Sequence, residues 1–371
     1  MVMQSDALAE LGPQQLVGSY RIGKEIGRGG MGTVYEARHT VLPRRAAIKV
    51  MHPELLRHPG MASRMVHEAA ILEDIRHPGV VRVYECNVLA DRRPWIAMEL
   101  VEGETLAERL HYTSRLAPIE LAKLLSEVAD VLASVHARSI VHRDMKPDNL
   151  LLTPTDRDFP LRVLDWGVAH LGPLGRLTLD GLTPGTPIYM APEQATGRDI
   201  SAPCDIYSLG VIAYEALTGH PPFDGRTLAE VVCMHLTREP EPLQVITNAP
   251  RDLCALVHRM LDKDAAHRPG AVEVRQIARA LVLELQNAAY EELEITGADR
   301  PRAQRVRPRA MVVPTDEVSV VDPDALEFGT TELLPVIHTP RWTPEIATAP
   351  VTIMPRHPRD LVSGEIRPKR R

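Results

Sequence analysis

Three glycines near the N-terminus have a spacing that can serve phosphate binding. Gly27, Gly29 and Gly32 form a G-x-G-x-x-G pattern. Strand-favouring residues follow Gly32, and no G-K-[ST] is present, so the pattern fits neither a dinucleotide-binding turn that opens a helix nor a Walker A loop. In a glycine hairpin, backbone N–H groups can approach phosphate oxygens without obstruction by side chains. A tight hairpin without a ligand explains the pattern equally well, so both interpretations stay open for this motif alone.

A lysine lies within the next apolar run, Ala46–Met51. An ammonium group in such a strand is unfavourable unless its charge is paired. Lys49 has two candidate partners: a nucleotide phosphate, and the carboxylate of Glu68 on the expected face of the following predicted helix. An edge lysine that extends to solvent is the alternative.

The strongest signal is V-H-R-D-M-K-P-D-N at 141–149, followed by V-L-D-W-G at 163–167. Together with the glycine pattern and the A-I-K lysine, in this order, these motifs resemble those of the eukaryotic-type (Hanks-type) protein kinases, especially the bacterial serine/threonine kinases. The resemblance covers roughly Tyr20 to Leu285. It implies a serine/threonine protein kinase that transfers the γ-phosphate of ATP with Mg²⁺, or alternatively Mn²⁺, to hydroxyls of protein substrates.

The resemblance also implies roles for the residues of these motifs. Asp144 would accept the hydrogen bond of the incoming hydroxyl, and Lys146 would contact the γ-phosphate. Asn149 and Asp165 would supply oxygen ligands to Mg²⁺, which prefers such ligands.

For the nucleotide, the resemblance implies that Lys49, held by Glu68, contacts the α- and β-phosphates. Met98 would be the gatekeeper of the rear pocket, and the backbones of Glu99 and Val101 would bind the adenine edge. The full predicted nucleotide site consists of Ile26, Gly27, Arg28, Gly29, Gly30, Met31, Gly32, Val34, Ala47, Lys49, Met98, Glu99 and Val101. Each apolar member of this set could equally be core.

Control of activity is a further implication. Lys146 and Thr186 match serine/threonine kinases rather than tyrosine kinases, with Thr186 positioning the substrate. An arginine such as Arg143, beside the catalytic aspartate, usually receives a phosphate from the activation segment, because phosphothreonine pairs well with arginine. We therefore expect activating autophosphorylation at Thr178 or Thr183.

Several matched residues are expected to be scaffold. Glu193 would pair with Arg268, and Asp205 would brace the catalytic-loop backbone. Trp166 replaces the phenylalanine that usually follows the metal-binding aspartate. This leaves metal binding by Asp165 untouched but puts a large flip of the segment in doubt, since indole is harder to repack. An ordered stack linking the lobes would comprise Leu72, Val83, Trp166 and His142.

A strand-rich part and a helical part must position these residues. Strand patterns cover 20–26, 33–37, 46–51, 80–86 and 95–100, and helical spacing covers 61–76, 119–137, 205–217, 228–236, 252–261 and 272–292. This order predicts an α+β, two-lobed protein kinase fold with a β-rich small lobe and a helical large lobe. The predicted boundaries are 1–19 for an N-terminal extension, 20–98 for the small lobe, 99–103 for the hinge, 104–292 for the large lobe and 293–371 for a tail.

The predicted tail is rich in proline and arginine, which prevents sustained helix and favours disorder. Its threonines permit two interpretations. The tail is either a solvated linker or an autophosphorylated strip that docks a phosphothreonine-binding partner.

Composition and charge limit the kinds of partner and the cellular location that we expect for the protein. The chain has 371 residues, of which 44% are hydrophobic and 25% charged, and its net charge is −6, so neither nucleic acid nor an anionic membrane surface is an expected partner. The four cysteines are scattered, no signal peptide is recognisable, and no apolar run approaches the ~20 residues of a membrane span. We expect a cytoplasmic protein, with homodimerisation through the small lobe as a family expectation.

Two rival functions are compatible with a kinase-like fold. A nucleotide-binding pseudokinase scaffold is disfavoured because Lys49, Glu68, Asp144, Asn149 and Asp165 are all present. A small-molecule kinase of the same fold is disfavoured by the complete segment Gly185–Glu193, which in the family shapes a peptide-binding ledge.

Overall fold

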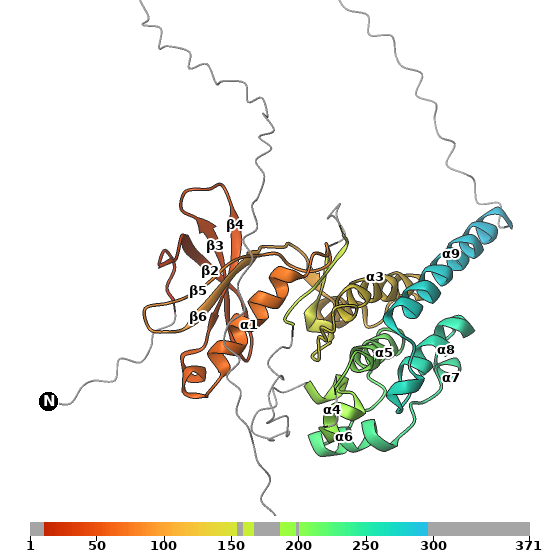
Figure 1. Cartoon of the computed structure of the whole chain (residues 1–371). Helices are drawn as coiled ribbons and strands as arrows, with labels where there is room; N and C mark the ends of the chain where they lie inside the picture. Colours follow the sequence, from red (N-terminus) through yellow and green to blue (C-terminus); the bar gives the residue numbers. More distant parts are fainter. Residues whose placement is uncertain (1–10, 154–158, 167–185, 198–199, 296–371) are drawn as a thin grey trace, which may run out of the picture. The chain divides into compact units, whose positions relative to one another are not determined.

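The computed structural model describes residues 11–153, 159–166, 186–197 and 200–295 of the chain (Figure 1). The side chains at 186–187 and 289–295 are not part of this description. Thr178, Thr183 and the tail beyond residue 295 lie outside the described residues, so the expectations attached to them stay predictions. All described residues belong to one unit of the chain, which reaches to Pro301.

The first part is a six-stranded antiparallel sheet with the order β1-β2-β3-β4-β6-β5. Its strands are β1 (Leu16–Val17), β2 (Tyr20–Arg28), β3 (Gly32–His39), β4 (Arg45–Met51), β5 (Val83–Val88) and β6 (Pro94–Glu99). Consecutive strands are neighbours except where β6 lies between β4 and β5, because hairpins connect most of them.

Side chains from both faces of the central strand β4 pack in the core. Ala46, Ile48 and Val50 pack in one core cluster, while Met51 packs in another with Met65 of helix α1 (Met61–Asp74). This follows from the two-residue period of a strand, which directs alternate side chains to opposite faces. Lys49, one residue before Val50, therefore lies on the face that α1 covers (Figure 1).

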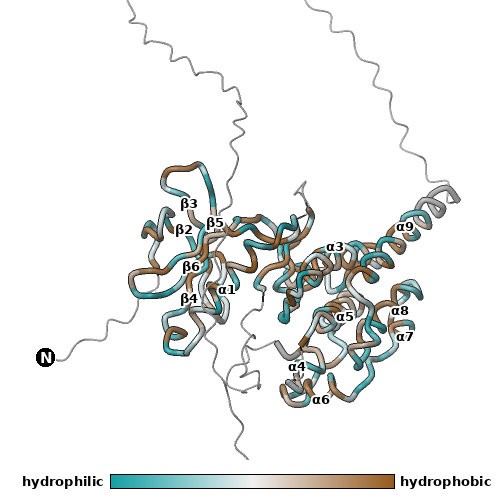
Figure 2. The backbone as a smooth tube through the Cα atoms, viewed as in Figure 1, coloured by the Kyte–Doolittle hydropathy of each residue, from teal (hydrophilic) through white to brown (hydrophobic). Residues whose placement is uncertain are grey.

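The second part is mainly helical. Its helices are α2 (Leu106–Thr113), α3 (Pro118–His136), α4 (Pro192–Thr196), α5 (Pro203–Thr218), α6 (Leu228–Thr237), α7 (Leu243–Ile246), α8 (Arg251–Met260) and α9 (Ala271–Ile295), with single turns η2 (Pro147–Asn149), η5 (Thr186–Tyr189) and η6 (Ala265–His267). Helix α5 is buried along almost its whole length, and α3 packs against both α5 and α9. A second sheet, β7-β8-β9, consists of Glu104–Thr105, Leu150–Leu152 and Leu161–Val163. Brown and teal residues follow one another along most helices, as expected where one face is buried (Figure 2).

The α+β fold with a β-rich and a helical lobe, predicted from the sequence, is confirmed. The small-lobe sheet begins earlier than the predicted boundary at Tyr20, because β1 pairs with β2 and Leu11 packs in the same core. Helix α9 continues to Ile295, past the predicted end at 292. Within the described residues, no helix combines the length and apolar character needed to cross a bilayer.

Candidate active site

Lys49 is the buried centre of an ion-pair cluster. Its Nζ lies 3.3 Å from Oε1 of Glu68 and 2.8 Å from Oδ1 of Asp165, so the lysine of β4 joins α1 to the segment after β9. Only 6% of Lys49 is exposed, which excludes the alternative of a lysine that extends to solvent. The Lys49–Glu68 contact predicted from the sequence is confirmed.

The electrostatics of this cluster favour a charged lysine. Burial disfavours the ammonium form of Lys49, but the carboxylates of Asp165 and Glu68 outweigh it and raise the lysine pKa above its ordinary value. The Lys49 charge lowers the pKa of Asp165. Burial raises the pKa of Glu68, although the lysine opposes this. Asp165 is thus the stronger anionic partner, and 57% of its side chain is open to solvent.

A second group of polar side chains lies on the catalytic loop, in and before the turn η2. Lys146 Nζ donates to Oδ2 of Asp144 at 3.0 Å. The Nδ2 group of buried Asn149 donates to the Asp144 carbonyl at 2.7 Å and to Oδ2 at 3.4 Å. Because Nδ2 makes both bonds, the amide oxygen of Asn149 is oriented to accept or coordinate another group.

One buried carboxylate braces this loop. Oδ2 of Asp205 accepts from the backbone N–H of His142, and Oδ1 accepts from that of Arg143, both at 2.8 Å. His136 Nε2 also lies 2.8 Å from Oδ2. Burial opposes ionisation, but the hydrogen bond from His136 and the nearby imidazoles outweigh it, so the pKa of Asp205 is lowered. The predicted bracing contact of Asp205 is confirmed.

The side chains of the predicted stack lie together, although the His142 and Trp166 rings are tilted by 55° rather than parallel. The rings of His142 and Trp166 are 4.8 Å apart, and His142 Nε2 donates to the Leu164 carbonyl at 2.9 Å. The Trp166 indole donates to Val163 O at 3.2 Å. Leu72 and Trp166 share one core cluster, against which Val83 packs. The tryptophan therefore fits the position that the sequence assigned to it.

The glycine pattern forms the turn between β2 and β3. Gly29 N donates to Gly32 O at 3.0 Å, and His52 holds the turn through two bonds: its backbone N–H donates to Met31 O and its Nε2 to Gly29 O. A Cβ added at Gly32 would lie 2.2 Å from Val50 O, whereas one at Gly29 would meet nothing within 4 Å. Gly32 is therefore required by packing, while Gly29 leaves open space. Sequence reasoning missed His52, since nothing in its local pattern distinguishes it.

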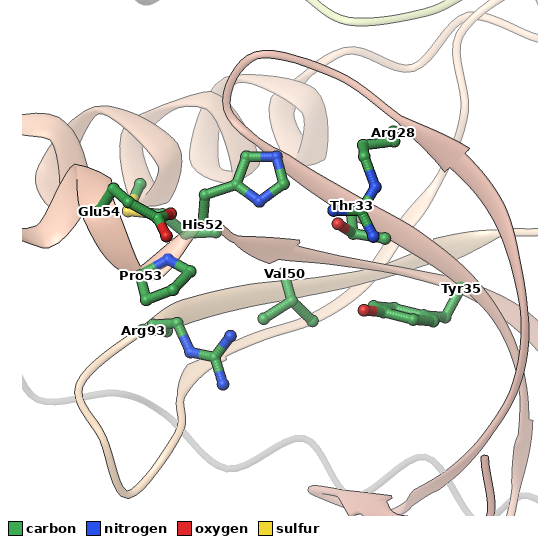
Figure 3. A pocket seen from close by; sticks show the side chains of 9 residues that line it. Arg28, Thr33, Tyr35, Val50, His52, Pro53, Glu54 and Arg93 are labelled. Atoms are coloured by element: carbon green, nitrogen blue, oxygen red, sulfur yellow. The ribbon is translucent and has the colours of Figure 1, made fainter. Parts of the chain in front are cut away.

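Arg28 does not join the Lys49 cluster. Its guanidinium bonds both carboxylate oxygens of Glu25. It also lines a pocket of about 120 Å³ whose walls include Thr33, Tyr35 and His52 (Figure 3). This pocket contains none of the ion-paired residues around Lys49, so it is separate from the candidate active site.

Strand register gathers the other predicted nucleotide residues. Val34 pairs with Lys49, and Ala47 pairs with Met98, so all four lie on the face of the sheet that α1 covers. Glu99 N donates to the Arg82 carbonyl at 2.8 Å. Val101 follows β6 and is partly exposed; Ile26 is 42% exposed, while Gly27, Gly30 and Met31 lie in or beside the hairpin turn.

The predicted scaffold pair is confirmed. Arg268 donates from Nη1 and Nη2 to the two oxygens of Glu193, at 2.7 and 2.9 Å. Thr186 is the first residue of η5, and its side chain lies outside the description.

These features agree with comparisons to known proteins. A profile of the protein kinase domain matches residues 20–278. The chain belongs to the protein kinase family. The resemblance predicted from the sequence is thereby confirmed, and the kinase motifs coincide with the geometric cluster described above.

Similar curated kinases come from bacteria. The chain is 38% identical over 269 residues to the serine/threonine-protein kinase pkn2 of Myxococcus xanthus, covering 70% of this chain and 32% of that protein. It is 36% identical to Pkn1 of the same organism, covering 80% of this chain and 42% of the relative. It is 37% identical to PknA of Mycobacterium tuberculosis, with 68% and 58% covered. The chain thus spans 32% to 58% of these relatives' lengths.

The donor set at this site fits a divalent metal bound together with phosphate. Protein kinases generally use ATP and a divalent metal ion. Among the described residues, no group of three His, Cys, Asp or Glu side chains is placed to hold a metal. Asp165 and Asn149 instead offer hard oxygen ligands, and Mg²⁺ is typically bound by one or two carboxylates plus substrate phosphates.

Proposed function

We propose that this chain is an ATP-dependent protein kinase that phosphorylates serine or threonine hydroxyls of proteins. One observation carries the proposal. Lys49 binds Glu68 and Asp165 at the same time, so the small-lobe sheet, helix α1 and the segment after β9 meet around one charge. In protein kinases, both this lysine–glutamate pair and the metal-binding aspartate must be in place for phosphoryl transfer.

Phosphoryl transfer depends on positioning and on neutralising charge. Asp144 is placed to accept a hydrogen bond from the substrate hydroxyl and to orient its oxygen. Lys146, 3.0 Å from that carboxylate, provides a positive charge beside the transferred group. Arg143 presents its backbone in a left-handed conformation, with a φ of 67°, which Asp205 holds.

Mg²⁺ is the ion that we propose for Asp165 and Asn149, with Mn²⁺ as an alternative. When bound, it would neutralise the charge that develops on the phosphates. Lys49 then holds the α- and β-phosphates, and Glu68 keeps the lysine in place. Asp165 is suited to this task, because its pKa is lowered and its side chain is accessible.

For adenine, we propose the backbones of Glu99 and Val101, with Met98 as gatekeeper. The N–H of Glu99 is already used by Arg82, so the carbonyl of Glu99 is the group that would face the adenine edge. Ile26, Val34 and Ala47 would pack on the faces of the ring, and the turn 27–32 would cover the phosphates.

The test is transfer of label from γ-labelled ATP to a generic basic protein in the presence of Mg²⁺. We expect activity that chelation abolishes, and an Asp144→Asn variant that loses at least ~100-fold in kcat while unfolding like the parent chain. ATP binding without turnover would support a nucleotide-binding pseudokinase instead. Transfer of label only to small molecules would support a small-molecule kinase of the same fold.

We further propose activation by autophosphorylation at Thr178 or Thr183, with Thr186 positioning the substrate. This proposal is supported by Arg143, a positively charged residue directly before Asp144 in the chain. Purified protein with both threonines replaced by alanine should lose most of its activity; full activity would contradict the proposal. A phosphothreonine-binding partner at the tail and a homodimer through the small lobe stay predictions, as does the cytoplasmic location.

A further inference from the structure

A chain of hydrogen bonds runs through the second part of the molecule to the turn η5. Lys263 Nζ lies 3.1 Å from the hydroxyl oxygen of Tyr207. That hydroxyl lies 2.9 Å from Nδ1 of His235, and His235 Nε2 lies 2.9 Å from the carbonyl oxygen of Ile188. The three side chains come from the segment after α8, from α5 and from α6, and the chain ends on backbone.

The chemistry of these groups fixes the direction of every bond. The Ile188 carbonyl can only accept, so Nε2 of His235 carries the proton. In the neutral ring Nδ1 is then an acceptor, and the Tyr207 hydroxyl must donate to it. An ammonium group can only donate, so Lys263 donates to the Tyr207 oxygen. Each group thus makes its neighbour a better donor toward Ile188.

Packing around its side chains holds this series of hydrogen bonds in place. Tyr207 and His235 are fully buried. The Phe223 ring lies 4.9 Å from His235, and Lys263 Nζ lies 4.2 Å from the same phenylalanine ring. Burial and the charge of Lys263 lower the pKa of His235 to about 4, which keeps the ring neutral at physiological pH.

The turn η5 has three described anchors. Ser208 Oγ donates to the Tyr189 carbonyl at 2.7 Å, and the Tyr189 hydroxyl donates to Glu215 at 2.7 Å. Both of these come from α5. His235 supplies the third from α6, and its bond to the Ile188 carbonyl is two residues after Thr186, the proposed substrate-positioning residue.

We propose that His235 is a positioning residue for the protein substrate. Through the Ile188 carbonyl it fixes the backbone of Thr186–Tyr189, and Tyr207 sets its tautomer. This inference rests on the proposed kinase function. It predicts that losing the Nε2 bond weakens the use of protein substrate and leaves the use of ATP unchanged, because the Lys49 and Asp165 contacts do not involve α6.

Two amide variants separate the bond from packing. In His235→Gln the amide nitrogen can take the place of Nε2, whereas in His235→Asn it is too short to reach Ile188. Loss of one hydrogen bond corresponds to a change of roughly threefold to tenfold in a binding constant. We expect His235→Asn to raise KM for a generic basic protein by about that factor, with KM for ATP within about twofold of the parent value, and His235→Gln to restore most of the loss.

A matched pair on α5 tests the role of Tyr207. Tyr207→Phe should raise KM for the protein substrate. Tyr214→Phe should not, since the Tyr214 hydroxyl donates to Glu241 O on a different path. Equal effects of both variants, or equal KM values for His235→Asn and His235→Gln, would overturn the inference.

Hydrogen–deuterium exchange of residues 186–190 provides a readout that needs no turnover. Faster exchange in His235→Asn than in His235→Gln is expected even if the parent chain transfers no phosphate, which distinguishes failure of this inference from failure of the proposed function. Unchanged exchange in both variants would refute it.

Discussion

Asp205 shows how much one side chain can determine in the candidate active site. Its two oxygens hold consecutive N–H groups of the catalytic loop. The second belongs to Arg143, whose φ of 67° is unusual for a residue with a side chain and is unfavourable by about 1–3 kcal/mol. The loop therefore adopts this conformation because a buried acceptor compensates for it.

Replacing Asp205 by asparagine should be strongly damaging. In either orientation the amide nitrogen of asparagine would face a backbone N–H, that of His142 or that of Arg143, and leave this buried donor without a partner. We expect the free energy of unfolding to fall by about 2–3 kcal/mol and kcat to fall with it. Urea denaturation and transfer assays would measure both. A stable but inactive variant would show that the brace serves catalysis alone, and a fully active one would contradict the argument.

At the residue scale, some contacts of the candidate site could be predicted from the sequence and others could not. Lys49, Glu68, Glu193, Arg268 and Asp205 were paired correctly, because their motifs carry the pairing. His52 and His235 were missed. Each binds a backbone carbonyl, 23 and 47 positions away in the chain, and backbone acceptors leave no residue-type signal in a sequence.

Among the elements, the hairpin of β2 and β3 offers a matched pair of glycine substitutions. Gly32→Ala would place Cβ 2.2 Å from Val50 O, so strand β4 must shift. We expect a loss of about 1–3 kcal/mol in unfolding free energy, together with a higher KM for ATP.

Gly29→Ala serves as the control for fold. Its Cβ meets nothing within 4 Å, so stability should change by less than about 1 kcal/mol. If the turn covers phosphates as proposed, Gly29→Ala still raises KM for ATP. If both KM and stability stay unchanged, the turn does not approach the nucleotide closely.

The elements that were not predicted are short or formed by distant pairing. Helix α2 has a capping box, Thr105 with Glu108, that sequence reasoning overlooked although the T-x-x-E pattern is visible. Strands β1, β7, β8 and β9 have two or three residues each, too few for a periodic pattern. Long helices such as α3 and α5 were predicted to within two residues at each end, since their apolar spacing extends over several turns.

At the scale of the whole molecule, buried His235 links stability to pH. The folded protein keeps this ring neutral down to about pH 4, while an unfolded histidine titrates near 6.5. Between these values the unfolded chain binds more protons, so the free energy of unfolding falls as pH decreases through that window. A separation of about 2.5 pH units corresponds to about 3 kcal/mol.

His235→Gln isolates this effect from other titrating groups. Burial also lowers the pKa of His77 and His258, and Glu127, whose pKa burial raises to about 7, acts in the opposite direction. These contributions are common to both proteins. Between pH 7 and 4.5, His235→Gln should lose about 2 kcal/mol less than the parent chain in urea denaturation. Identical pH profiles would mean that the ring does not stay neutral.

Trp166 lies where its fluorescence would be sensitive to changes around Asp165. The indole is buried, lies beside the His142 ring and directly follows Asp165 in the chain. Only two other tryptophans are present, Trp95 and Trp342. With both replaced by phenylalanine, tryptophan emission would come from Trp166 alone, and its surroundings would change if a cation drew the Asp165 carboxylate away from Lys49. The tryptophan at this position would thus report binding of the proposed ion in solution, without any added dye.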